Sequence, residues 1–267
     1  MVVEAVTFPR WTGALPAVGE VAAMIDHSLL RPELVRADID AGLETAMAYR
    51  VASVCVRPGD VPYAARRLAG TGVAIGTVVA FPHGSSTTGT KVVETNQAVE
   101  NGADEIDMVV DIGRSRDGDV EFTAAEIGAV VEAARGRCVK VILENHHLTE
   151  EQKVAGCRAA ERAGASYVKT STGFAGGGAT AADVALMRAT VSPGVGVKAA
   201  GGVRTLDALL ELNRLGATRF GATATAAILD DLAGRLADGT TTRSPAERRA
   251  EVDGVELRTD GAQRPGR

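Results

Sequence analysis

From about residue 21 onward, short apolar runs alternate with longer stretches in which apolar residues recur every three or four positions. The short runs are almost continuously apolar, which is typical of strands that are covered on both faces. They predict eight strands, at residues 21–26, 51–56, 73–80, 104–110, 138–143, 165–170, 195–199 and 218–222.

The longer stretches have the period of amphipathic helices and fall between the predicted strands. Thr149 and Thr180 are suited to begin two of them, and Gly102, Gly136, Gly164 and Gly216 fall at helix ends, where a left-handed cap is expected. The predicted helices span residues 39–49, 61–68, 90–101, 124–135, 150–163, 181–189, 206–215 and 224–236.

Eight strand–helix units without a long interruption predict an α/β fold with a parallel sheet. A single-domain (β/α)8 TIM barrel of about 200–250 residues fits this number of units. A doubly wound open sheet is the alternative, because periodicity does not show whether the sheet closes. We expect an N-terminal extension at 1–20, the barrel at 21–237 and a polar, mobile tail at 238–267, with one short helix beginning near Ser244.

Composition excludes several classes of protein. The chain has 267 residues, of which 45% are hydrophobic, and its net charge of −5 argues against a nucleic-acid binder. No apolar run approaches the roughly 20 residues that span a bilayer, so no membrane partner is expected. The first 20 residues lack the pattern of a signal peptide, and three widely spaced cysteines suggest free thiols. We therefore expect a cytoplasmic protein.

Two lysines interrupt predicted strands that would otherwise be apolar. Lys169 and Lys198 each lie near the carboxyl end of a strand, and each strand opens into a glycine-rich turn. Partial burial and a second nearby cation would both lower the pKa of an amine, which favours a neutral nucleophile that forms a Schiff base. The alternative is that both amines reach the surface or pair with carboxylates.

In a barrel, functional side chains gather at the carboxyl ends of the strands. Asp107 is the strongest candidate there, because an unpaired charge in its apolar run would be unfavourable. It could carry protons beside an imine or form a structural ion pair. Glu144 could orient an amine or form a salt bridge, and Cys55 is better explained as a small buried residue than as a nucleophile.

Glycine-rich turns follow three successive predicted strands, beginning at Gly173, Gly201 and Gly221. Their backbone N–H groups could together bind one phosphate. Neither a Walker-type loop nor an early Gly-x-Gly-x-x-Gly is present, so nucleotide binding is not expected. His146 and His147 are adjacent, and the four histidines lack the spacing of metal ligands, so we expect neither a metal nor a cofactor.

Five segments together resemble the deoxyribose-phosphate aldolase family of class I, Schiff-base aldolases. The similarity runs in order from about residue 24 to 229. The segments are Ile25-Asp26-His27-Ser28-Leu29-Leu30, Phe81-Pro82-His83-Gly84, Gly102-Ala103-Asp104-Glu105-Ile106-Asp107-Met108-Val109, Val168-Lys169-Thr170-Ser171-Thr172-Gly173-Phe174 and Lys198-Ala199-Ala200-Gly201-Gly202-Val203-Arg204-Thr205.

The resemblance implies reversible cleavage of 2-deoxy-D-ribose 5-phosphate to acetaldehyde and D-glyceraldehyde 3-phosphate. Lys169 matches the Schiff-base lysine, Lys198 the lysine that perturbs it, and Asp107 the proton-relay aspartate. A homo-oligomer is compatible with the sequence. Strand-end position and resemblance together give the expected substrate-binding residues: Asp26, Cys55, Glu144, Thr170, Gly173, Gly201, Gly202, Arg204, Gly221 and Thr223.

The chain departs from the family pattern in three places. Where the family usually has two phosphate-binding serines, this chain has Thr223 and Ala224. Glu144 is not followed by the usual threonine, and the long C-terminal tail lacks the terminal tyrosine of some members. Two alternatives therefore stay open: an aldolase for another 2-deoxy or unphosphorylated sugar, and a non-catalytic sugar-phosphate sensor.

Overall fold

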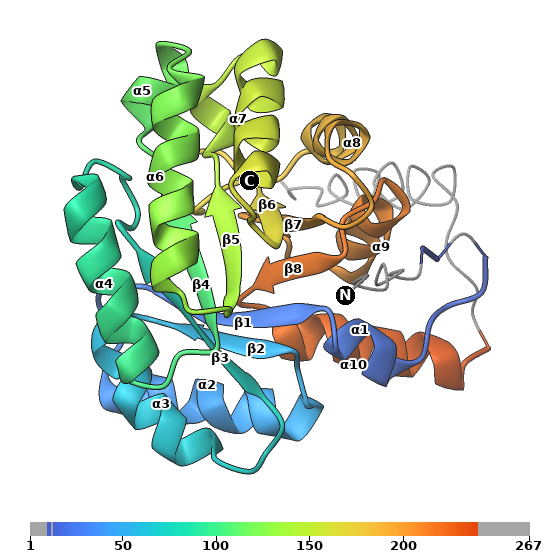
Figure 1. Ribbon diagram of the computed structural model, residues 1–267. Coiled ribbons are helices and arrows are strands. Elements are labelled where there is room, and N and C mark those ends of the chain that lie inside the picture. Colours follow the sequence, from blue (N-terminus) through green and yellow to red (C-terminus); the bar gives the residue numbers. More distant parts are fainter. Residues whose placement is uncertain (1–9, 12, 240–267) are drawn as a thin grey trace, which may run out of the picture.

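Eight short parallel strands close into a barrel in the computed structural model, which describes residues 10–11 and 13–239 (Figure 1). Strand β1 pairs with β8 as well as with β2, so the fold is a (β/α)8 barrel and the open-sheet alternative is wrong. The strands are β1 (Ile25–Leu29), β2 (Ser53–Val56), β3 (Ala74–Val79), β4 (Glu105–Val109), β5 (Cys138–Ile142), β6 (Tyr167–Lys169), β7 (Gly196–Ala200) and β8 (Arg219–Ala222).

Helices surround the barrel and follow the strands in order (Figure 1). They are α1 (Val18–Ala22), α2 (Arg36–Tyr49), α3 (Val61–Leu68), α4 (Thr88–Glu100), α5 (Ile112–Arg116), α6 (Val120–Ala133), α7 (Glu150–Arg162), α8 (Ala181–Thr190), α9 (Leu206–Arg214) and α10 (Thr225–Ala237), with 3₁₀ turns at Pro58–Asp60 and Asn145–His147. As predicted, Thr149 and Thr180 cap α7 and α8. The four glycines expected at helix ends all have positive φ.

The first predicted strand is misplaced. Val21 and Ala22 end helix α1, and strand β1 begins only at Ile25. All three residues are fully buried, and a short buried helix cannot be distinguished from a buried strand by apolar content alone. Helix α6 also begins earlier than predicted, at Val120, because the side chain of Asp119 caps it.

Residues on alternate positions of the strands point to opposite sides of the sheet. On β4, Ile106 and Met108 belong to the apolar core, whereas Glu105 and Asp107 belong to a polar cluster inside the barrel. The strands therefore direct apolar side chains outward to the surrounding helices and charged side chains into the barrel interior. The charged interior positions the candidate site.

Trp11, which precedes α1, contacts the barrel helix α9, although the sequence analysis set residues 1–20 apart from the barrel. The Trp11 N–H donates to Asn213 Oδ1 at 3.0 Å, and Arg214 Nε donates to the Trp11 carbonyl at 3.2 Å. The predicted tail, including the short helix near Ser244, lies almost entirely outside the described residues. No helix between residues 13 and 239 has the length and apolar character needed to cross a bilayer.

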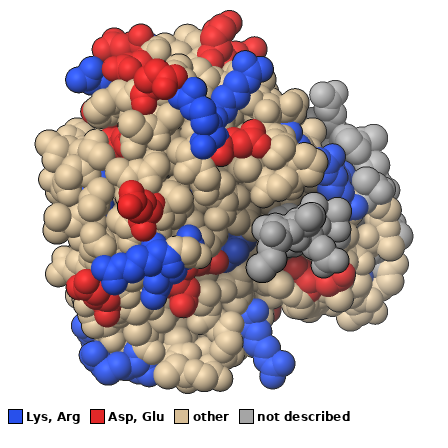
Figure 2. Space-filling model, in the orientation of Figure 1, with Lys and Arg blue, Asp and Glu red and all other residues tan. Residues whose placement is uncertain are grey.

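Charged groups of both signs are interspersed in small groups on the face shown in Figure 2, and neither sign covers a large continuous area of it. This arrangement agrees with the mixed charge of the sequence, which has 29 Lys and Arg and 34 Asp and Glu. The face shown has none of the continuous basic surface that a nucleic-acid binder uses.

Candidate active site

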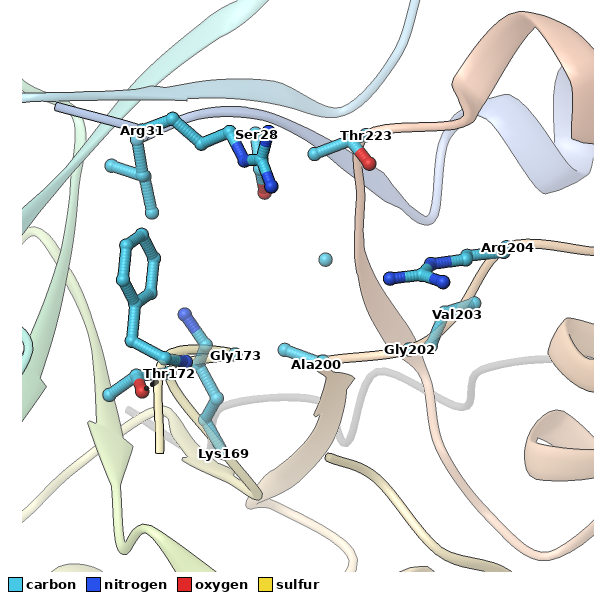
Figure 3. Close-up of a pocket in the computed structure, with 14 residues that line it drawn as sticks. Ser28, Arg31, Lys169, Thr172, Gly173, Ala200, Gly202, Val203, Arg204 and Thr223 are labelled. Atoms are coloured by element: carbon cyan, nitrogen blue, oxygen red, sulfur yellow. Dashed lines mark hydrogen bonds between the residues drawn. The ribbon is translucent and has the colours of Figure 1, made fainter. Parts of the chain in front are cut away.

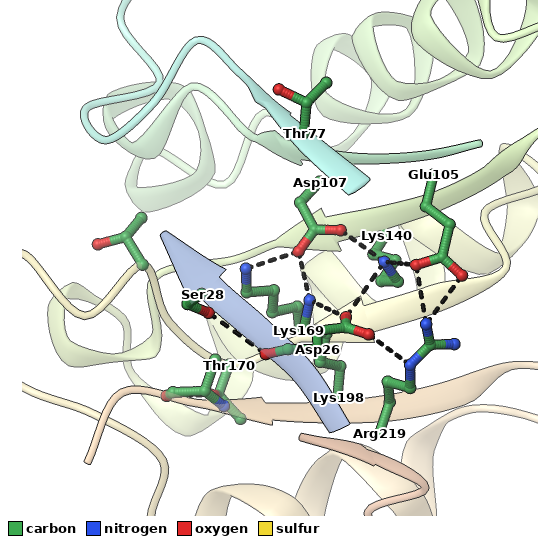
Figure 4. Close-up of polar contacts among 12 residues, drawn as sticks. Asp26, Ser28, Thr77, Glu105, Asp107, Lys140, Lys169, Thr170, Lys198 and Arg219 are labelled. Carbon is green, nitrogen blue, oxygen red and sulfur yellow. Dashed lines mark hydrogen bonds and ion pairs between the residues drawn. The ribbon is translucent and has the colours of Figure 1, made fainter. Parts of the chain in front are cut away.

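The two lysines singled out in the sequence lie side by side inside the barrel. Lys169 is the last residue of β6, and it is the register partner of Lys198 on β7. Both residues are buried, with exposed surface fractions of 3% for Lys169 and 1% for Lys198. Both Nζ atoms donate to the same atom, Asp107 Oδ2, at 2.7 and 2.6 Å. The structure thus brings all three expected catalytic residues together (Figure 4).

Asp107 also contacts a third lysine, which the sequence analysis did not identify. Lys140 on β5 donates from Nζ to Asp107 Oδ1 at 2.8 Å. Asp26 on β1 faces the same group, since its Oδ2 pairs with Lys198 and lies 3.3 Å from Lys140 Nζ. Asp107 is therefore the centre of the cluster, and each of its carboxylate oxygens has at least one ammonium partner.

A further layer lies beside Lys140, toward the amino ends of the strands. Glu105, the first residue of β4, accepts from Lys140 Nζ at 2.6 Å and from Arg219 Nη2 at 2.9 Å. Arg219, the first residue of β8, also donates from Nε to Asp26 Oδ1 at 2.6 Å. These contacts join Asp26 on β1, Glu105 on β4 and Arg219 on β8 into the same cluster as the three lysines.

Charge balance in this cluster favours a neutral, unprotonated state for one of its basic groups. Among the described residues, the cluster joins the carboxylates of Asp26, Glu105 and Asp107 to four basic groups, those of Lys140, Lys169, Lys198 and Arg219. An uncompensated buried charge is strongly unfavourable. The cluster is electrically neutral when one of the four bases is unprotonated.

The pKa shifts identify that base as Lys169. Burial lowers the pKa of Lys169 and the nearby Lys198 lowers it further, so the pKa lies below its usual value despite the opposing effect of Asp107. Burial also acts on Lys198, but Asp107 and Asp26 outweigh it and raise the Lys198 pKa. The same balance against Asp107, Asp26 and Glu105 raises the pKa of Lys140 well above its usual value.

Lys169 is also the member of the cluster that reaches a pocket. The pocket has a volume of about 490 Å³ and lies at the carboxyl ends of the strands. In Figure 3 the Lys169 amine points into this space, and Arg31 and Arg204 extend toward it from opposite sides. The lining residues are Ser28, Leu30, Arg31, Lys169, Thr172, Gly173, Phe174, Ala200, Gly201, Gly202, Val203, Arg204, Gly221 and Thr223.

The glycine-rich turns form one wall of the pocket because their backbones approach closely. Gly201 has a φ of +81°, and a Cβ atom at Gly178 would lie only 2.2 Å from the Gly201 carbonyl oxygen. The Ala179 N–H donates to that same carbonyl at 3.0 Å. Side chains at these positions would separate the β6–α8 and β7–α9 loops, so glycine is required for the shape of the wall.

Of the ten expected substrate-binding residues, six line the pocket and four do not. Thr170 is fully buried and exchanges hydrogen bonds with the backbone of Ala200, and Cys55 is 2% exposed with a pKa raised to about 11 by burial. Asp26 lies in the charged cluster. Cys55 and Thr170 are at the expected end of the barrel, but other residues cover them. Asp26 is the second residue of β1 and is therefore not at the carboxyl end of its strand, where it was expected.

Glu144 has a different environment from the one expected, because it pairs with no amine among the described residues. Its Oε2 accepts hydrogen bonds from both the N–H and the hydroxyl of Thr172, the former at 3.1 Å. Thr172 Oγ1 in turn accepts from the Phe174 N–H at 3.0 Å. Glu144 therefore fixes the loop that carries Gly173 and Phe174 into the pocket.

Three members of the charged cluster were missed, although the sequence contained their signal. Lys140 and Arg219 interrupt apolar strand runs in the same way as Lys169 and Lys198 do. No glycine-rich turn follows Lys140, and both Lys140 and Arg219 lie before the carboxyl ends of their strands, where the site residues were expected. Among the pocket-lining residues, Ser28 and Arg31 were also missed: Ser28 is the fourth residue of β1, and Arg31 lies in the loop that follows this strand.

The histidines are not grouped in a way that would bind a metal. His27 is buried, its Nδ1 lies 2.8 Å from Thr225 Oγ1, and burial lowers its pKa to about 4. The rings of His146 and His147 stack edge to face, with centroids 5.2 Å apart. Within residues 13–239, no three His, Cys, Asp or Glu side chains converge as ligands. Metal independence stays a prediction.

The fold and the pocket define a barrel enzyme whose site lies at the carboxyl ends of its strands. The chain belongs to the DeoC/LacD aldolase family, whose model matches residues 21–229. This match confirms the family resemblance seen in the sequence, and it covers all eight strands.

Several named proteins are similar to the chain over most of its length. It is 52% identical over 211 residues to deoxyribose-phosphate aldolase 2 of Staphylococcus aureus, covering 79% of this chain and 96% of the relative. It is 50% identical to deoxyribose-phosphate aldolase of Bacillus mycoides, covering 78% and 94% of the two chains. The crystal structure of a putative deoxyribose-phosphate aldolase from Coccidioides immitis superimposes with a TM-score of 0.80 at 37% identity, covering 86% and 92%.

Proposed function

We propose that this protein is a deoxyribose-phosphate aldolase that cleaves 2-deoxy-D-ribose 5-phosphate to acetaldehyde and D-glyceraldehyde 3-phosphate, reversibly, in deoxyribose phosphate catabolism. The observation that carries the proposal is the surplus base of the charged cluster, Lys169, whose lowered pKa accompanies access to the pocket. The relatives named deoxyribose-phosphate aldolase, at about half identity, support the substrate.

In the proposed reaction, the neutral amine of Lys169 adds to the C1 aldehyde of the open-chain sugar. Loss of water gives a protonated imine, for which the Lys198 ammonium is the proton donor. The C3 hydroxyl then loses its proton, through a water molecule, to the Lys198 amine, the C2–C3 bond breaks, and its electron pair moves into an enamine on Lys169. Glyceraldehyde 3-phosphate leaves, and protonation at C2 followed by hydrolysis releases acetaldehyde and restores Lys169.

Asp107 and Lys198 are assigned to proton transfer in this scheme. Asp107 Oδ2 lies within hydrogen-bond distance of both amines, so a proton moving between them has a continuous path. Burial favours a protonated Asp107, but the ammonium groups of Lys140 and Lys198 outweigh it and keep its pKa well below the usual value. The carboxylate therefore remains ionised and orients both amines, and a water molecule completes the path to the sugar.

In this proposal, the substrate phosphate binds in the part of the pocket away from Lys169. Gly202, Gly221 and Thr223 line this part, and the guanidinium groups of Arg204 and Arg31 extend toward it (Figure 3). Backbone N–H groups and arginines are strong donors to phosphate oxygens. The sugar chain would then extend from the phosphate toward the Lys169 amine.

The direct test is turnover of deoxyribose 5-phosphate, with both products measured, in EDTA and without added metal or cofactor. We expect cleavage under these conditions and a much lower kcat/KM for unphosphorylated deoxyribose. Loss of activity in EDTA that zinc restores would contradict the lysine mechanism. More efficient turnover of the unphosphorylated sugar would favour the alternative aldolase instead.

The second candidate function is an aldolase for another 2-deoxy or unphosphorylated sugar, and the observation in its favour is Ala224. The Ala224 side chain does not line the pocket but packs against the apolar core at the start of α10. The hydroxyl of Thr223 is therefore the side-chain donor that this turn presents to the pocket. A non-catalytic sensor is disfavoured, because sensing requires no amine with a lowered pKa.

Thr223→Val is expected to raise the KM for deoxyribose 5-phosphate by about 10–100-fold, since hydrogen bonds to charged groups contribute about 1.5–3 kcal/mol. The KM for unphosphorylated deoxyribose should change little. Steady-state kinetics with both sugars measures the difference, and Ala224→Ser is the matched control, with a smaller effect because residue 224 faces the core. Equal changes for both sugars would show that Thr223 does not contact the phosphate.

We also propose a homo-oligomer in a reducing compartment, the cytoplasm. A structurally similar deoxyribose phosphate aldolase from Aeropyrum pernix, 28% identical, is described as tetrameric. All three cysteines, Cys55, Cys138 and Cys157, are free thiols, as expected from the sequence. Light scattering of the purified protein tests the assembly.

A further inference from the structure

Lys140 occupies a position in the charged cluster that the proposed reaction does not use. It is 1% exposed and does not line the pocket, so it does not touch a substrate there. Its Nζ atom nevertheless lies 2.8 Å from Asp107 Oδ1, on the opposite carboxylate oxygen from the one that Lys169 and Lys198 share. Lys140 therefore acts on Lys169 through Asp107, and it shares both Asp107 and Asp26 with Lys198.

The contacts of Lys140 show that it is held in place independently of the pocket. Its amine has three carboxylate neighbours, Glu105 at 2.6 Å, Asp107 at 2.8 Å and Asp26 at 3.3 Å. Glu105 is in turn fixed by Arg219, with both carboxylate oxygens 2.9 Å from Nη2. The Lys140 charge is therefore permanent and fixed in position. It partly neutralises Asp107 through Oδ1, the oxygen that Lys169 and Lys198 do not contact.

Neutralisation of Asp107 bears directly on Lys169. Asp107 is the main group that favours protonation of Lys169. The more of the Asp107 charge that Lys140 balances, the weaker is the attraction between Asp107 and a Lys169 ammonium. Without Lys140, the cluster would contain three carboxylates and three bases, and it would be neutral only with Lys169 protonated.

The other titratable groups around Lys169 and Lys140 do not supply this charge. Strand β3 contributes the uncharged Thr77, whose hydroxyl donates to the Val56 carbonyl. Burial raises the pKa values of Cys55, Cys138 and Tyr167, which therefore stay neutral near pH 7. The charged groups that face the cluster are Asp26 from β1, Glu105 and Asp107 from β4, Lys140 from β5, Lys198 from β7 and Arg219 from β8.

We propose that Lys140 is a positioning residue for catalysis, whose fixed charge, held by Glu105, offsets Asp107 and keeps Lys169 unprotonated at neutral pH. This inference rests on the proposed role of Lys169 as the nucleophile. It assigns a function to the buried layer of Lys140, Glu105 and Arg219: the charges of this layer determine whether the cluster is neutral with Lys169 protonated or unprotonated.

The test measures the protonation of Lys169 without any sugar. Reductive methylation with formaldehyde and cyanoborohydride, followed by peptide mass mapping, gives the rate of Lys169 labelling against pH, and this rate follows the neutral amine. Lys140→Met should move the midpoint upward by about one unit or more, which lowers labelling at pH 7 by about tenfold per unit. Glu105→Gln removes an anion instead, and it should move the midpoint downward.

Two further variants separate charge balance from general damage. The double variant Lys140→Met with Glu105→Gln restores neutrality with Lys169 unprotonated, so its midpoint should return toward that of the wild type. Lys91→Met removes another fully buried lysine, one that pairs with Glu126 at 2.7 Å outside the cluster, and should leave the midpoint unchanged.

A Lys140→Met protein that folds with an unchanged midpoint would overturn the inference, and so would a double variant that shifts as far as Lys140→Met alone. If Lys140→Met does not fold, an unchanged midpoint in Glu105→Gln overturns it. The kcat/KM profile for deoxyribose 5-phosphate tests the proposed function separately. Shifted labelling in a protein that does not cleave this sugar would support the charge balance and reject the substrate.

Discussion

Replacing Lys169 with methionine is expected to abolish turnover of deoxyribose 5-phosphate, lowering kcat by at least about 10⁴-fold. Methionine has a similar length and no amine, so the imine cannot form. The fold should persist, because the three remaining bases of the cluster then balance its three carboxylates. Borohydride reduction with substrate, followed by peptide mass mapping, measures the result: the wild type should carry the adduct on the Lys169 peptide and the variant should carry none.

Lys153→Met serves as the control for this experiment. Lys153 lies on α7, pairs with Asp183 at 2.7 Å and does not line the pocket, so its replacement should leave both adduct and kcat unchanged. An adduct found only on another lysine of the wild type would reject Lys169 as the nucleophile. Turnover that survives in Lys169→Met would reject covalent catalysis by this residue.

The parts of this site that the sequence revealed are those in which one residue contradicts its local pattern. A charged side chain within a buried strand requires a compensating partner, so Lys169, Lys198 and Asp107 could be selected without knowledge of the fold. Closure of the barrel could be proposed from eight strand–helix units, because short connections and parallel strands leave few arrangements. The register that makes Lys169 and Lys198 direct neighbours required the structure.

The parts of the site that were not predicted either lie away from the carboxyl ends of the strands or depend on tertiary packing. Glu105 and Arg219 are the first residues of their strands, and a search of strand ends near the pocket does not reach them. Cys55 and Thr170 are at the correct end of the barrel, but whether a side chain is exposed there depends on the loops above it. The conformation of those loops also decides that Arg31 reaches the pocket.

Buried ionic groups seldom contribute to stability in proportion to their number, because removing each charge from water is unfavourable. A seven-residue charged cluster at the centre of a barrel is therefore better explained by function than by stability. The alternating signs around Asp107 and Asp26 leave one base in excess, and that base faces the pocket. The same arrangement makes the site sensitive to every charge within it, including charges that no substrate touches.

Lys198→Met is expected to give the second largest effect, and its pH dependence distinguishes it from Lys140→Met. Loss of the neighbouring ammonium raises the pKa of Lys169, so imine formation at pH 7 should slow by about 10–10³-fold. Asp26 and Asp107 keep Lys140, Arg219 and Lys169 as partners, so the variant should fold. Rates of borohydride trapping and of turnover, both measured against pH, give the two effects separately.

The sign of the pH effect follows from which form of Lys169 reacts. Only the neutral amine attacks, so a raised pKa removes activity at neutral pH and restores it as the pH rises through the new value. In Lys140→Met, both trapping and turnover should recover at high pH. In Lys198→Met, neither should recover fully, because general acid catalysis by Lys198, which contributes about 10²–10⁴-fold and assists imine formation, is also lost. Full recovery of turnover in Lys198→Met would show that Lys198 acts only through its charge, and an unchanged pH profile would show that it does not set the pKa of Lys169.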